Sequence, residues 1–138
     1  MRKLTAILAA SLLIFSACKK DNDDDPDNNP NMTVEEKIIG MWTGDVQTIH
    51  TVFPPIIDTT ETVDISWLNL EFKSDGTMIS DSAGVDADTL DWVLLSDDMI
   101  TLDGDTFDIN TITTTNFNLG ASESFMGATV DMEIKLVK

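Results

Sequence analysis

Short runs in which apolar and polar residues alternate follow one another along most of the chain, with turn residues between them. The clearest run spans residues 130–136, where every second residue is apolar and each residue between is charged. A period of two is typical of a strand that buries one face and exposes the other. About eight such runs occur at the spacing expected of an all-β barrel or sandwich. Successive hairpins favour an antiparallel up-and-down barrel.

Turn residues and a change of phase define where the expected strands end. Turns are predicted at Lys73–Gly76, at Ser96–Asp98 and, as a tight hairpin, at Asp103–Gly104, because Asp, Ser and Gly favour such positions. The alternation changes phase between Trp67 and Leu68, which predicts a bulge or a sharp bend. The expected strands cover residues 42–52, 63–72, 77–79, 90–94, 100–102, 107–109, 112–119 and 130–136. The less regular segments 53–58 and 82–88 are expected at the mouth of the barrel.

Residues 33–138 are expected to form one domain, because this length supports a single core. Thr33 and Glu36 have the spacing of a capping box, which predicts a short helix over residues 34–39. Gly40 is expected to end that helix immediately before the first strand.

The first residues of the chain have the pattern of a secretory signal peptide. Two basic residues precede an uncharged run over residues 4–17 that ends in small residues. The stretch Phe15-Ser16-Ala17-Cys18 resembles the lipobox of bacterial lipoproteins. The resemblance implies removal of residues 1–17, a lipid on Cys18, and attachment to the outer membrane of the cell envelope.

Residues 18–32 are expected to hold the lipidated Cys and a flexible, acidic tether. Residues 19–31 are mostly Asp and Asn and have no apolar side chain, so they favour a solvated segment. An acidic run behind the Cys also resembles the surface-export signal of Bacteroidetes lipoproteins, which implies a protein on the cell surface. A spacer that faces the periplasm is the alternative.

Charge and composition exclude several functions. The chain has 8 Lys and Arg against 25 Asp and Glu, a net charge of −17, which disfavours nucleic acid and bare anionic membrane as partners. A single Cys and a single His support neither an internal disulfide, nor a zinc site, nor a His-based triad. We therefore expect no cofactor, no metal site and no enzymatic activity. His50 shares the alternation phase of Trp42 and is expected to point inward.

Three segments carry a resemblance to a known family. Gly40-Met41-Trp42 resembles the G-x-W signature of lipocalins, and residues 70–77 and 92–102 resemble the hairpins of small lipocalin-like lipoproteins of Bacteroidetes. The resemblance implies a calycin-like barrel with Gly40 and Trp42 at its base. In the wider family a late basic residue packs over the Trp indole. The chain beyond residue 17 has no Arg, so Lys135 is the candidate here.

An eight-stranded barrel either fills its interior with side chains or keeps room for one small molecule. Trp67, Trp92, Phe107 and Met132 are the candidate wall residues for a small apolar or amphipathic ligand. The same side chains would form a solid core in the alternative function. That alternative is a non-catalytic surface module that presents its loops to a protein or glycan partner. A monomer is expected in both cases.

Overall fold

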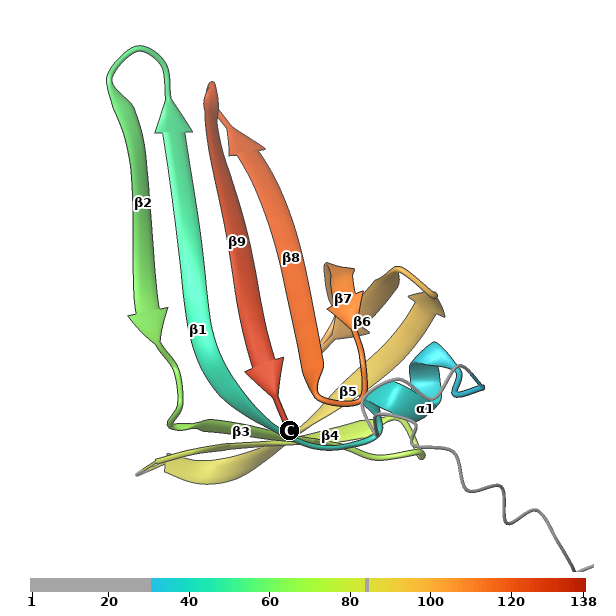
Figure 1. Ribbon diagram of the computed structural model, residues 1–138. Helices are drawn as coiled ribbons and strands as arrows, with labels where there is room; N and C mark the ends of the chain where they lie inside the picture. Colours follow the sequence, from blue (N-terminus) through green and yellow to red (C-terminus); the bar gives the residue numbers. More distant parts are fainter. Residues whose placement is uncertain (1–30, 84) are drawn as a thin grey trace, which may run out of the picture.

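The computed structural model describes residues 31–83 and 85–138 (Figure 1). The expected signal peptide, Cys18 and most of the expected tether lie outside these residues. Within the described residues, no helix is long and apolar enough to cross a membrane.

The described residues form one short helix and nine strands. In chain order these are α1 (Val34–Ile38), β1 (Gly40–Phe53), β2 (Ile57–Asp64), β3 (Leu68–Phe72), β4 (Thr77–Ser82), β5 (Val85–Ser96), β6 (Met99–Leu102), β7 (Asp105–Ile112), β8 (Asn116–Phe125) and β9 (Ala128–Val137). Eight of these strands close an antiparallel barrel, because β1 pairs with both β3 and β9. The predicted all-β, eight-stranded, up-and-down barrel with a short N-terminal helix is therefore confirmed.

The capping box at the start of α1 forms as predicted. The Thr33 side chain accepts a hydrogen bond from the backbone N–H of Glu36, whose carboxylate accepts one from the backbone N–H of Thr33. Ile38 at the end of the helix is fully buried. The two reciprocal bonds satisfy helix donors that would otherwise be free, so the helix is held against the barrel.

Two segments of the expected strand pattern differ from the structure. Residues 57–64 form a separate strand, β2, and the predicted bend near Trp67 is a complete break between β2 and β3. Every residue of β2 is exposed, so its sequence has no alternation of apolar and polar residues. The pattern therefore did not predict a separate strand there. Residues 112–119 are not one strand, because the Thr113 hydroxyl accepts hydrogen bonds from the N–H groups of Thr115 and Asn116 and forms a turn. Such local side-chain bonds compete with a continuous strand.

A β-bulge in β1 lets this strand change partners. Gly40 to Thr43 pair with β3, whereas Val46 to Phe53 pair with β2, and the pairing with β9 shifts register between Gly44 and Val46. A side chain on Gly44 is excluded, since an added Cβ would lie 2.2 Å from the carbonyl oxygen of Ile65. The extra residue at the bulge reverses the alternation that follows it.

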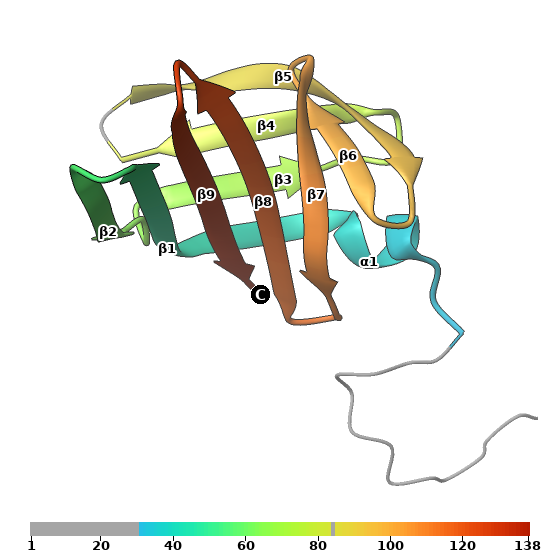
Figure 2. The ribbon, with the colours of Figure 1, turned by 90° about the horizontal axis from the view of Figure 1, so that it is seen from above.

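The long strands continue past the closed part of the barrel as a four-stranded sheet. We call this the projecting sheet: β2, β1 from Val46 onward, β9 up to Lys135, and β8 from Gly120 onward. Figure 1 shows these strands rising together from the base. Figure 2, seen from above, shows β8 and β9 running across β3 and β4.

The opposite end, which we call the base, is filled by aromatic side chains. Trp42 and Phe117 have ring centroids 5.4 Å apart, and Phe72 contacts both Trp92, at 5.6 Å, and Phe117, at 5.8 Å. All four rings are buried, and the three contacts have the tilted or edge-to-face geometry that aromatic pairs favour. The Trp42 indole N–H donates to the carbonyl of Ile38 at 2.7 Å, which joins α1 to the core.

The basic residue over the Trp42 indole is Lys138, so the expectation of Lys135 is wrong. The Lys138 ammonium lies 4.3 Å from the indole centroid and donates to the carbonyls of Lys37 and Ile39, both at 3.0 Å. Partial burial lowers the pKa of Lys138. The two carbonyls and the indole face offset that desolvation. Lys135 instead lies on β9, next to Glu133 at 3.6 Å.

We expect Gly44→Ala to lower the free energy of unfolding by about 3 kcal/mol, the upper part of the range for overpacking, because the contact is with backbone. Gly120→Ala is the matched comparison, since its Cβ would meet only the Asn110 side chain, at 2.6 Å. That amide can move, so the loss should be smaller. Urea unfolding of both variants measures the difference, and equal losses would contradict the role given to the bulge.

We expect Lys138→Met to lower the free energy of unfolding by about 1–2 kcal/mol, because it removes the cation from the indole and from two helix carbonyls. Lys135→Met removes the same charge from an exposed pair and should have a smaller effect. Chemical denaturation followed by Trp fluorescence measures both. A larger loss for Lys135→Met would show that Lys138 does not secure the base.

Candidate functional site

The inner face of the projecting sheet continues the core outward along β9. Leu136 is fully buried among the core residues, and Ile134 packs against them. Met132 is half-buried and Val130 is 38% exposed. Because side chains two residues apart share a face, these four residues form one apolar row that runs from the base into solvent.

Neighbouring strands widen this row around Met132. Ile49 of β1 and Ala121 of β8 are its register partners, and paired residues of antiparallel strands share a face. The side-chain amide of Gln47 donates to the Met132 sulfur at 3.0 Å. Glu61 of β2 lies next to Ile49 in register. The inner face therefore offers an apolar centre with an amide and a carboxylate beside it.

The structure places the four predicted wall residues in three different environments. Trp92 is buried in the core, and its indole N–H donates to the carbonyl of Lys73 at 3.0 Å. Phe107 is half-buried and packs against the same core. Met132 lies farther out on the inner face, and Trp67 is 51% exposed between β2 and β3. Trp92 and Phe107 share one cluster, whereas Met132 and Trp67 stand apart from it, and their role toward a ligand stays a prediction.

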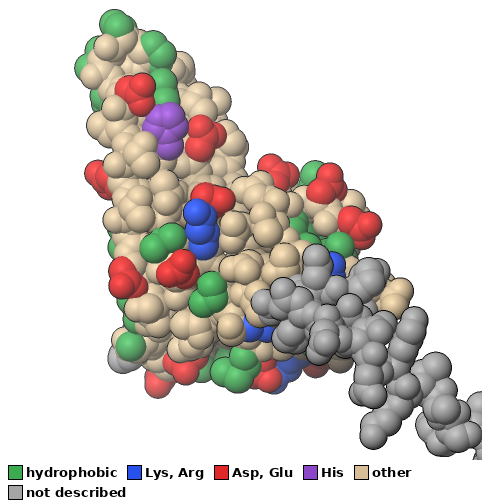
Figure 3. Space-filling model, in the orientation of Figure 1, with side chains coloured by type: hydrophobic (Ala, Val, Ile, Leu, Met, Phe, Trp, Pro, Cys, Tyr) green, Lys and Arg blue, Asp and Glu red, His purple; other side chains and the backbone are tan. Residues whose placement is uncertain are grey.

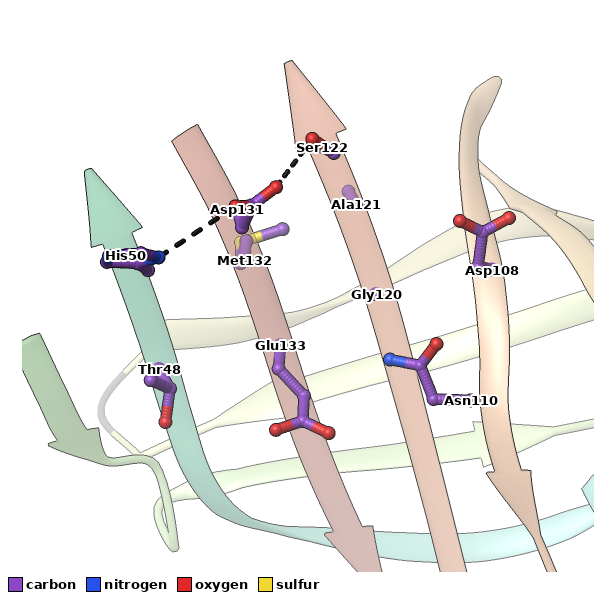
Figure 4. A pocket seen from close by; sticks show the side chains of 10 residues that line it. All are labelled: Thr48, His50, Asp108, Asn110, Gly120, Ala121, Ser122, Asp131, Met132 and Glu133. Atoms are coloured by element: carbon purple, nitrogen blue, oxygen red, sulfur yellow. Dashed lines mark hydrogen bonds and ion pairs between the residues drawn. The ribbon is translucent and has the colours of Figure 1, made fainter. Parts of the chain in front are cut away.

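The outer face of the projecting sheet carries a polar groove of about 280 Å³ (Figure 4). It crosses β1, β9, β8 and β7 and is lined by Thr48, His50, Asp108, Asn110, Gly120, Ala121, Ser122, Asp131, Met132 and Glu133. Of these, Ala121 and Met132 lie between the outer-face residues along β8 and β9, and the strand alternation assigns their side chains to the inner face. The bare backbone of Gly120 leaves space, and the Asn110 amide lies over it. None of the described residues that line the groove is Lys or Arg, so its polar groups are carboxylates together with neutral hydroxyl and amide groups and the imidazole of His50.

His50 lies on this outer face, so the expectation that it points inward is wrong. Its Nε2 is 2.9 Å from the carboxylate of Asp58, and its Nδ1 is 3.9 Å from that of Asp131. The bulge at residues 44–46 reverses the alternation between Trp42 and His50. His50 thus connects β2 and β9 across β1. Figure 4 shows its contact with Asp131 of β9.

The order of groups in the groove does not match a catalytic relay. The Ser122 hydroxyl donates to Asp131 at 2.5 Å, and Asp131 stands between Ser122 and His50. In a Ser-His-Asp triad the imidazole receives the serine proton and the carboxylate orients the imidazole. Within the described residues, no cluster of three or more His, Cys, Asp or Glu side chains could hold a metal ion.

Sequence analysis missed the groove, because four strands contribute to it and only their register brings the residues together. The alternation in β8 and β9 does place Ser122, Asp131 and Glu133 on an outer face. It does not show that Gly120 lies beside the Asn110 side chain of β7, where the β7–β8 pairing is irregular.

A second hollow of about 350 Å³ lies at the base, between the N-terminal end of α1 and the β3–β4 turn. Asp75 lines it and accepts hydrogen bonds from the hydroxyl and the backbone N–H of Thr77. These bonds lower the pKa of Asp75, because they stabilise the ionised carboxylate. The carboxylate is therefore engaged in forming the turn.

No family model matches this chain, and no curated protein does.

Proposed function

We propose that this chain is a lipoprotein of the cell envelope whose barrel binds a small apolar or amphipathic molecule on the inner face of the projecting sheet. The observation that supports this function is the row from Leu136 to Val130, which extends the core into solvent. Apolar surface that continues a core and remains partly exposed is typical of a binding surface.

The residues around the row favour an amphipathic ligand. Met132, Ile49 and Ala121 offer an uncharged centre, and thioether side chains adapt to ligands of irregular shape. The Gln47 amide and the exposed Glu61 carboxylate are the polar groups beside it. A ligand with an apolar body and a hydrogen-bond donor or a positive charge would satisfy both parts.

The alternative is the surface interaction module with a filled barrel. The packed aromatic base supports it, because the rings at that end contact one another directly. The polar outer groove would then be the surface offered to a glycan or a protein. The two functions differ in whether a small molecule occupies the inner face.

We expect Met132→Glu to weaken the binding of an uncharged apolar dye, N-phenyl-1-naphthylamine, by about tenfold, because it places a charge in the centre of the row. The measurement is a dye titration with residues 18–138 carrying Cys18→Ser, which contain every described strand. Val93→Glu is the matched control, since Val93 is apolar, 54% exposed and on β5. Unchanged binding in Met132→Glu would contradict the proposed face. Absence of dye binding by the parent chain would favour the interaction module.

We expect the mature protein from a diderm bacterium to begin at Cys18 and to carry acyl chains. Several acyl chains give stable membrane attachment, so the protein should partition into a detergent phase. Cys18→Ser should remove the lipid mass. An intact mass that still includes residues 1–17, or a mature chain that carries no lipid on Cys18, would contradict the lipoprotein proposal.

A further inference from the structure

Two hairpin turns at the free end of the projecting sheet expose large apolar side chains. The β1–β2 turn carries Ile56, which is 74% exposed, and Ile57, which is 41% exposed. The β8–β9 turn carries Phe125 and Met126, which are 75% and 82% exposed. Figure 1 shows both turns at the top of the molecule, and Figure 3 shows hydrophobic side chains gathered there.

The two turns form one surface. The β1–β9 pairing continues as far as Val52 and Thr129, immediately before the turns. A Cβ added to Gly127 would lie 3.9 Å from the Phe53 ring, so the β8–β9 turn borders the β1–β2 hairpin. We call the set Phe53, Ile56, Ile57, Phe125 and Met126 the apolar tips.

Turn geometry does not explain the Met in the β8–β9 turn. Met126 and Gly127 have φ values of 50° and 85°, and the β6–β7 turn has nearly the same pair, with Asp103 at 51° and Gly104 at 90°. Asp, Asn and Gly are the residues that tolerate this left-handed conformation in tight hairpins. Asp103 follows that preference, whereas Met126 places a long apolar side chain there at a conformational cost. The hairpin geometry alone therefore does not account for the Met126 side chain.

The charge around the tips is unusual for this chain. Residues 53–57 and 124–130 contain no charged side chain, although the net charge is −17. The nearest charged residues on three of the four strands that lead to the turns are acidic: Asp58, whose side chain is 79% exposed, Glu123 and Asp131. On β1 the nearest ionisable residue is His50, which lies beside Asp58 and Asp131. The apolar tips carry no charge, and carboxylates lie next to them along the hairpins. Such a surface suits a neutral apolar medium, whereas an anionic medium would repel the carboxylates.

From these observations we propose that the apolar tips insert into the interface of a lipid bilayer with zwitterionic headgroups. The tips project as turns, and a bilayer accepts projecting side chains without a shaped pocket. The headgroup–acyl boundary takes apolar side chains to a depth of about 5–10 Å. The inner-face row concerns a different surface, so this proposal holds or fails independently of ligand binding.

The chain before the barrel is long enough for such an orientation. With the anchor proposed on Cys18, 13 residue steps separate it from Asn31, the first described residue. The 14 residues of β1 also span 13 steps. At about 3.3 Å per step, 13 steps reach at most about 43 Å in either segment. A domain that contacts the bilayer through its tips could therefore keep its base one strand length away from the same bilayer.

The test is flotation with phosphatidylcholine vesicles of residues 18–138 carrying Cys18→Ser, which have no lipid anchor. We expect the parent chain to float with the vesicles and the Phe125→Ser/Met126→Asp variant to bind at least about tenfold more weakly. Met126→Asp copies the Asp103–Gly104 turn, so the barrel should unfold at the same or a higher urea concentration. Leu95→Asp is the matched control, since Leu95 is apolar, 55% exposed and on β5, and should bind as the parent does.

A reporter separates insertion from adsorption. Phe125→Trp should show blue-shifted fluorescence with vesicles and quenching by brominated phosphatidylcholine, and binding should fall as phosphatidylglycerol replaces phosphatidylcholine. Stronger binding to the anionic vesicles would overturn the proposal. Absence of vesicle binding by the parent chain would also overturn the proposal. In that case, sedimentation equilibrium would show whether the chain self-associates through the tips. A chain that remains a monomer would point to a protein partner.

Discussion

The architecture depends on the pairing of β1 with three other strands. Its first residues pair with β3, its later residues pair with β2, and β9 pairs with it from Thr43 to Val52, which closes the barrel. The exchange occurs at Gly44, where the backbone of Ile65 approaches too closely for any side chain. A regular strand without this bulge would keep one pairing partner on each side, so the barrel and the projecting sheet would not share it.

Local patterns predicted the elements whose signals lie within a few residues. The alternation over residues 130–136 gave β9, Asp103–Gly104 gave a hairpin turn, and Thr33 with Glu36 gave the start of α1. β2 escaped prediction because both of its faces are exposed, which removes the apolar period. The turn at Thr113 was hidden in a Thr-rich run that also suits a strand.

Side-chain positions that depend on register were harder to predict. His50 was assigned to the wrong face because the phase was carried through the bulge. Gly44 was the available signal, since a glycine inside a strand pattern often marks a bulge or a close approach of another backbone. Lys138 was passed over for Lys135, since a residue just beyond the last strand has no alternation to place it, although its ammonium reaches the carbonyl ends of α1. The alternation assigned Met132 to its face, whereas the polar groove required the alignment of four strands.

The base and the projecting sheet differ in how their surfaces are protected. At the base, α1 and Lys138 cover the aromatic core, so its four rings are buried. Along the projecting sheet, β2 is an edge strand among the described strands, and its Asp58, Glu61 and Asp64 oppose pairing with another edge by charge repulsion. The acidic composition thus protects an edge that would otherwise promote aggregation.

The apolar tips fit this arrangement because they lie in two hairpin turns and at the strand ends that border them. A turn offers few free backbone groups in strand geometry, so Phe125 and Met126 expose apolar surface without providing a template for strand addition. Acidic residues flank both tips along the hairpins, and two such ends would repel each other when they approach. Exposed apolar side chains that neither pair as strands nor meet a second copy favourably are best suited to an uncharged apolar phase. This preference for an uncharged phase follows from the distribution of charge. The acidic residues lie on the edge strand β2 and next to the tips, and none of the residues that form the tips is charged.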